Sequence, residues 1–213
     1  MVIASINDMF DSTMHAVTQC LLTPVLVVLS LFFIYALINM GILFAEYYKR
    51  RKGKFEIKQF INQILAVKGR KNDEEIIKII EEGNIPKRHK EVLKTLVGSS
   101  NVSKDFRESL AIKLVEDEGL WASKKLERTD IIAKISPAIG LMGTLIPLGP
   151  GLTALGSGDI QSLAQHLLIA FDAAVLGMAA AAVAFITSKI RRRWYEEDIS
   201  NLETLVDTVM EIS

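Results

Sequence analysis

The stretch LLIAFDAAVLGMAAAAVAFI, residues 167–186, decides the fold. It is long and almost entirely apolar, and about 20 residues of α-helix cross a hydrocarbon core about 30 Å thick. One carboxylate, Asp172, lies inside it. A charge in hydrocarbon is unfavourable unless something compensates it, so such a residue usually has a function. We therefore predict a membrane span over 163–188 in which Asp172 has a role.

Two further apolar stretches are long enough to cross a membrane. Residues 21–45 end at a basic sequence, YYKRRKGK, and residues 131–155 lead through the short turn GSGD into the third stretch. Helices joined by so short a connection are antiparallel neighbours. A cleaved signal peptide is the weaker interpretation of 21–45, because no positive charge precedes it and it is too long. We predict three spans.

The basic residues are confined to two blocks, which predicts the topology. All 25 Lys and Arg lie within 49–134 or 189–193. Basic loops stay on the cytoplasmic side of a membrane. The loop 46–130 and the tail 189–213 are therefore predicted to be cytoplasmic, with the N-terminus and the GSGD turn outside. This describes a multi-pass protein of the cell (plasma or inner) membrane.

The remaining segments also favour helices. Apolar residues recur at helical spacing near the N-terminus, at Ile3, Ile6, Phe10, Met14 and Val17. We predict a short amphipathic helix over 1–19 on the outer surface, with a disordered leader as the alternative. The loop 46–130 is predicted to be helical, and the tail 189–213 to extend the third span into the cytoplasm. Nothing suggests strands, so the predicted fold class is an all-α integral membrane protein, a single domain over 1–213.

No sequence pattern points to an enzyme. The chain has one cysteine, Cys20, and no spacing of Cys and His that suits a metal. It has neither the glycine pattern of a dinucleotide site nor a phosphate-binding loop, and no nucleophile–base pair is apparent. We expect no cofactor, no metal and no nucleic-acid partner.

The second span is unusually rich in glycine and proline. Pro147 removes a backbone hydrogen bond and collides with the carbonyl of Gly143, four residues earlier. The hydroxyl of Thr144 is placed to satisfy that carbonyl. Two interpretations follow: a kinked, tightly packed span, or a polar pore wall with Thr144 at its constriction.

The third span combines small residues with the carboxylate. Ala174 and Gly177 permit close helix contact. Asp172 lies about 14 Å from the outer end, near the middle of the membrane. Desolvation would favour its neutral form, which suits a group that handles protons or sodium. The alternative is a carboxyl that only bonds a neighbouring helix. His166 lies about 240° away around the helix, so a proton relay through it is a minor alternative to an interfacial role.

Two segments carry a family resemblance. KISPAIGLMGTLIPLGPGLTALGSGD, residues 134–159, and FDAAVLGMAAAAVAF, residues 171–185, resemble the second-span and third-span signatures of the MotA/TolQ/ExbB proton channel family. The motifs cover 116–190 well, and span order and chain length extend the likeness to nearly the whole chain. Three spans with an outside N-terminus look more like the TolQ/ExbB branch than the four-span MotA branch.

The resemblance implies an assembly. Family members form a homopentamer around two copies of a single-span partner of the ExbD/TolR/MotB type, which brings an intramembrane aspartate. Ion flow then rotates the pentamer and drives work at the cell envelope. Thr144 falls on the family's pore threonine.

This chain also departs from the family pattern at three positions. Ala174 stands where the third span carries a threonine, and Ile169 where ExbB-type members carry a glutamate. Asp172, three residues further on, could replace that glutamate one turn deeper. Pro147 stands where a glycine follows the GT motif.

The leading functional hypothesis is a subunit of an ion-motive-force-driven membrane motor, conducting H⁺ or Na⁺. A structural membrane scaffold that kept the fold without conduction is the second hypothesis. A solute transporter is weaker, because the chain has no internal repeat of the kind that many transporters carry.

Overall fold

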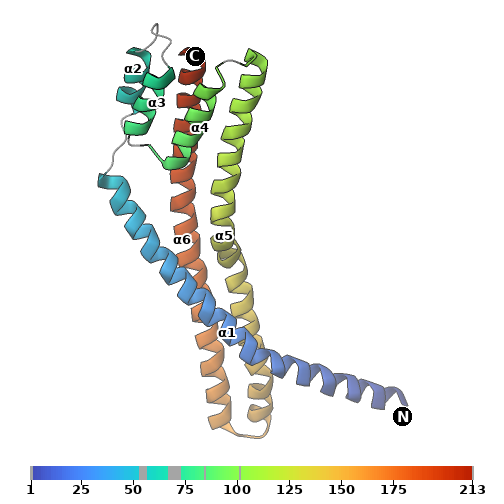
Figure 1. Ribbon diagram of the computed structural model, residues 1–213. Helices are drawn as coiled ribbons and strands as arrows, with labels where there is room; N and C mark the ends of the chain where they lie inside the picture. The colour runs from blue at the N-terminus through green and yellow to red at the C-terminus, as the bar shows by residue number, and fades with distance from the viewer. Residues whose placement is uncertain (1, 53–56, 67–72, 84, 101, 213) are drawn as a thin grey trace. The chain divides into compact units, whose positions relative to one another are not determined.

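The fold is entirely helical (Figure 1). The computed structural model describes residues 2–52, 57–66, 73–83, 85–100 and 102–212, with side chains from Thr13 onward in the first helix. The helices are α1 (Val2–Lys52), α2 (Ile57–Ala66), α3 (Asp73–Glu82), α4 (Lys87–Gly98), α5 (Lys104–Gly156) and α6 (Ile160–Ile212). The described residues contain no strand. Three helices, α1, α5 and α6, are long and apolar enough to cross a membrane. The predicted fold class, an all-α membrane protein with three spans, is confirmed.

The chain divides into two compact units, which we describe separately. The membrane unit consists of Met1–Leu43 and Arg128–Ser188, and the helical-bundle unit of Phe44–Glu127 and Lys189–Ser213. The long helices α1, α5 and α6 contribute residues to both units.

The first helix differs from the sequence expectation of two separate elements. A short helix over 1–19 and a span over 21–45 were expected, but α1 runs from Val2 to Lys52 without a break. Pro24 lies inside it. This proline removes one intrahelical bond, to the carbonyl of Cys20, and the residues just before it contain no glycine that would end the helix. The apolar side chains expected before Thr13 lie outside the described residues.

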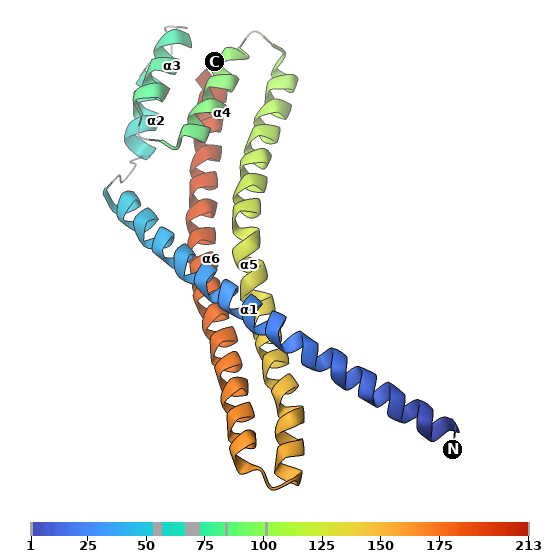
Figure 2. The ribbon, with the colours of Figure 1, turned by 60° about the horizontal axis from the view of Figure 1, so that its bottom comes forward.

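In the membrane unit, α5 and α6 form an antiparallel hairpin (Figure 2). Contacts pair Gly140 with Gly177, Gly143 with Ala173, and Gly151 with His166. Residue numbers rise along α5 as they fall along α6, so the two helices run in opposite directions. The connection between the helices is three residues long, and its Gly158 has a φ of 79°, which glycine adopts without strain.

Side-chain hydrogen bonds lie at both ends of the hairpin. At the turn, Asp159 accepts a hydrogen bond from the backbone N–H of Ser162 at 3.0 Å and so caps the start of α6. Near the opposite end of the membrane unit, the hydroxyl of Ser188 donates to the carboxylate of Asp130. The first bond fixes the start of α6 after the turn, and the second joins α6 directly to α5.

Helix α1 packs across this hairpin through apolar side chains. Val25 and Leu29 contact Ile146 of α5 and Ala173 of α6 in one cluster. A second cluster joins Ala36 of α1 to Ile132 and Ala184. Figures 1 and 2 agree that α1 crosses the hairpin obliquely. One side of the hairpin is therefore covered by α1 within a single chain.

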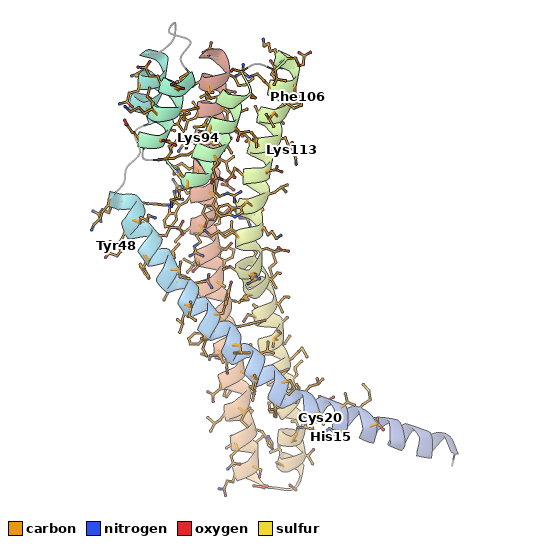
Figure 3. All side chains as sticks on the ribbon, viewed as in Figure 1. His15, Cys20, Tyr48, Lys94, Phe106 and Lys113 are labelled. Carbon is orange, nitrogen blue, oxygen red and sulfur yellow. The ribbon has the colours of Figure 1, made fainter. Side chains whose placement is uncertain are left out.

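The helical-bundle unit has its own apolar core. The core draws on α2, α3, α4, α5 and α6, and its fully buried members include Ile64, Ile80, Leu93, Leu96, Leu202 and Leu205. On its surface Lys94 of α4, labelled in Figure 3, pairs with Glu81 of α3. Burial of this apolar area is the main source of stability for the unit.

The same unit buries charged groups beside aromatic rings. Arg88 binds both carboxylate oxygens of Glu118 through Nε at 2.9 Å, and Glu118 is only 7% exposed. The Arg88 guanidinium also lies 4.5 Å from the ring centroid of Trp121. Such a pair satisfies a buried carboxylate that would otherwise be costly.

His89 predicts a specific pH dependence of stability. Burial lowers the pKa of its imidazole below the ordinary value of 6.5. The unfolded chain therefore binds the proton more readily than the folded one, so stability falls as the pH drops below 6.5. We expect His89→Gln to flatten this decline, by at most about 1.4 kcal/mol per pH unit. Urea or SDS unfolding of both proteins across this range measures it, and equal slopes would contradict the prediction.

Candidate ion path in the membrane unit

The helices of the hairpin approach so closely that backbone touches backbone. A Cβ added at Gly177 would lie 2.9 Å from the Cα of Gly140 and 2.9 Å from the carbonyl oxygen of Ser136. A Cβ at Gly143 would lie 2.7 Å from the Cβ of Ala173. Small residues permit this spacing, and the contacts fix the register of the two helices.

That register brings Thr144 and Ala174 together. Each lies one residue beyond the contacting pair Gly143 and Ala173, so both are at the same level. Each also lies two residues, about 200° of rotation, from a residue that packs against α1, namely Ile146 or Leu176. Thr144 and Ala174 therefore share the face of the hairpin opposite α1.

Asp172 lies at the same level but on the other side. It precedes Leu176 by four residues, which places both on one face of α6, the face turned toward α1. Asp172 is exposed, at the edge of an apolar surface formed by Leu168, Phe171 and Val175. The two predicted ion-path residues, Thr144 and Asp172, thus face different directions within one chain.

The hydroxyl of Thr144 bonds a different carbonyl from the one that the sequence predicts. The Thr144 hydroxyl donates to the carbonyl of Leu141 at 2.7 Å, and not to that of Gly143, which Pro147 leaves without its helical donor. Pro147 itself is fully buried. Thr144 is half-buried, so its hydroxyl oxygen remains on the open side of the hairpin as an acceptor.

A contact that the sequence did not suggest involves Gln19. Pro150 cannot donate a backbone hydrogen bond to the carbonyl of Ile146, four residues earlier. The side-chain amide of Gln19, on α1, donates to that carbonyl at 3.4 Å. The two residues are 127 positions apart, so no local pattern signals the contact. Gln19 ties α1 to the proline-rich end of α5.

This geometry predicts a coupling between Gln19 and Pro150. Gln19→Ala should destabilise the protein by about 0.6 kcal/mol, the usual strength of a side-chain hydrogen bond within a membrane. In a Pro150→Ala background the effect should vanish, because alanine at this position restores the backbone donor. Unfolding free energies of the four proteins in the cycle give the coupling. Independent, additive effects would show that the amide does not serve this carbonyl.

The remaining polar groups of the unit are spread along the hairpin. His166 packs on Gly151, where a Cβ would lie 3.3 Å from its own, and it does not meet Asp172. Ser136 is fully buried. His15, labelled in Figure 3, lies beside Gly149. Among the residues searched in the structure, no group of three or more His, Cys, Asp or Glu could hold a metal.

Comparison with known proteins assigns the family. The model of the MotA/TolQ/ExbB proton channel family matches residues 59–204, which include all of α5 and most of α6. A search of curated proteins found no match. The match covers well over half of the chain and the whole hairpin on which Thr144 and Asp172 lie. With its three membrane-spanning helices, the chain belongs to the MotA/TolQ/ExbB proton channel family and is a multi-pass membrane protein of the channel type.

Proposed function

We propose that this chain is the ring-forming subunit of a motor driven by the ion-motive force. Five copies surround a single-span partner of the ExbD/TolR/MotB type, and flow of H⁺ or Na⁺ is coupled to mechanical work at the cell envelope. The N-terminus lies outside, the helical-bundle unit and C-terminus lie in the cytoplasm, and the chain belongs to the TolQ/ExbB-like branch. The family match and the two blocks of basic residues support this proposal.

The observation that carries the proposal is the exposure of Asp172 in a single chain. Facing lipid, a charged aspartate at the centre of a helix costs about 2.5–3.5 kcal/mol on insertion scales. The apolar surface beside Asp172 gives it no partner of opposite charge. A neighbouring copy or a water-filled path would remove this penalty, which favours an assembly over a monomer.

The two faces of the hairpin suggest how the ring is built. In a closed ring each copy presents one lateral surface to the next. We place the Thr144 and Ala174 face toward the lumen, because α1 covers the opposite side with apolar residues that suit lipid. Asp172 lies exposed on the α1 side, and we place a neighbouring copy against it, where it takes up the transported ion, while Thr144 lines the lumen. The wall of this lumen is formed by the α5–α6 hairpin. It is kept thin and closely packed by Gly143, Gly177, Pro147 and Ala174.

One observation favours the alternative of a non-conducting scaffold. Ala174 stands beside Thr144 where the family pattern has a second hydroxyl. A lumen with a single hydroxyl per subunit provides fewer oxygen ligands for an ion or for water. A scaffold would assemble in the same way and show no flux.

The experiment that tests the proposal is purification of the native complex in mild detergent, followed by native mass spectrometry. The expected result is five copies of this chain with a small single-span protein that carries an intramembrane aspartate. A pentamer with no such partner would favour the scaffold. A monomer or dimer would overturn the ring.

A further inference from the structure

The helical-bundle unit contains a cavity that the ion path does not use. Its volume is about 320 Å³, and it lies among residues of α1, α4, α5 and α6 within this unit. We propose that this cavity binds a phosphate group, carried either by an anionic lipid or by the free ion.

The cavity has an excess of positive charge. Five basic side chains line it, Lys49, Arg50, Lys87, Arg88 and Lys125, against three carboxylates, Glu46, Glu118 and Asp198. The carboxylates are already neutralised: Asp198 pairs with Arg50, Glu118 pairs with Arg88, and Glu46 lies 3.4 Å from Arg191. Among the described residues, the three lysines have no carboxylate of their own in an ion pair. They leave the cavity short of negative charge.

A buried hydroxyl in the lining has no partner. Tyr195 is 6% exposed, and its hydroxyl makes no hydrogen bond in the described part of the chain. A buried polar group left without a partner is destabilising, so a ligand that accepts a hydrogen bond from Tyr195 would gain stability from it. Tyr195 is one of the residues that line the cavity, so an anion that reached its hydroxyl would accept this hydrogen bond.

The aromatic rings hold a cation near that hydroxyl. The ammonium of Lys125 lies 4.9 Å from the ring centroid of Trp121 and 5.4 Å from that of Tyr195. His89, 7% exposed, also lines the cavity, and burial, which lowers its pKa, keeps its imidazole neutral, with one N–H to donate. Ammonium, hydroxyl and imidazole donors together can serve separate oxygens of a phosphate group, which has three or four of them.

The sequence position of the cavity favours a lipid as the source. Glu46 directly follows the apolar stretch of α1, and Tyr195 follows that of α6 by a few residues. Tyr and Trp gather at the level of the lipid headgroups, and basic residues there bind anionic headgroups. A free phosphate ion would use the same donors.

Binding to the full-length protein in detergent tests the site, without any partner protein. The probes are dihexanoyl phosphatidylglycerol and inorganic phosphate, each measured by calorimetry at matched ionic strength. The variants are Tyr195→Phe and Lys125→Gln, and the matched control is Lys124→Gln, which changes the neighbouring exposed lysine outside the cavity. We expect each cavity variant to bind about tenfold more weakly, the contribution of one charge-assisted hydrogen bond, and the control to bind like the wild type.

The outcomes separate the two sources. Binding of the lipid alone identifies a headgroup site, and comparable binding of both probes identifies a site for the phosphate group itself. Tyr195→Phe loses no hydrogen bond of the unliganded protein, so its melting temperature without ligand should not fall. If Lys125→Gln folds poorly, the affinity of Tyr195→Phe alone tests the site. Binding of neither probe, or equal affinity in the wild type and Tyr195→Phe, would overturn the site. None of these results depends on the motor function.

Discussion

Gly177→Ala is expected to destabilise the protein by about 3 kcal/mol, the upper range for overpacking a tight contact. The new methyl group would lie 2.9 Å from the Cα of Gly140 and 2.9 Å from the carbonyl oxygen of Ser136. Both are backbone atoms, which cannot rotate away as a side chain can. The helices α5 and α6 must therefore move apart. This movement also displaces the face of the hairpin that carries Thr144.

Gly41→Ala is the matched control for this substitution. Gly41 also lies in the apolar part of a span, but no atom beyond its chain neighbours and its own helical backbone lies within 4 Å of the position of its Cβ. Alanine there should be neutral or slightly stabilising, because it is the better helix former by up to about 1 kcal/mol. SDS unfolding followed by circular dichroism gives both free energies. Equal losses at the two sites would mean that the close approach at Gly177 is not a stabilising contact.

Asp172→Asn is expected to reduce partner-dependent ion flux by about 100-fold, the usual contribution of a positioned proton-transferring side chain. The amide keeps the size of the carboxyl group but cannot ionise. The measurement is the flux of protons or sodium into vesicles that contain the complex. Asp159→Asn, which changes the exposed carboxylate in the hairpin turn, is the control and should retain normal flux.

The flux of the assembled variant separates conduction from packing, and its mass checks that the assembly is intact. If Asp172 conducts, Asp172→Asn keeps the native stoichiometry and loses flux. If Asp172 only joins neighbouring copies, the amide still forms hydrogen bonds and both assembly and flux persist. The second result would remove Asp172 from the ion path and leave Thr144 as its remaining candidate.

Charge and apolar length were enough to predict the spans. The two basic blocks and the GSGD turn determine where three helices can cross, and the structure has helices at all three stretches. The predicted segments 1–19 and 21–45 belong to one continuous helix, α1, because no residue between them ends a helix. A helix ends at a residue that breaks it, such as glycine or proline in a suitable position. The expected passage from the membrane surface into the membrane does not by itself end a helix.

The arrangement of the site was harder to predict because it depends on which helix faces pack. Sequence spacing places Thr144 and Asp172 in neighbouring spans. Only the contacts of Val25 and Leu29 with the hairpin show on which side α1 lies, and therefore that Thr144 and Asp172 are on different sides. The bond from Gln19 to the Ile146 carbonyl is likewise a consequence of tertiary packing.

The single thiol of the chain would give the proposed ring a built-in label. Cys20 is exposed on α1, close to where the apolar stretch begins, and no second cysteine competes with it (Figure 3). A maleimide dye would therefore mark each subunit once, at the same place, without mutagenesis. Photobleaching steps of one labelled particle then count its subunits, and polarisation of the same dye reports whether the ring turns when a gradient is applied.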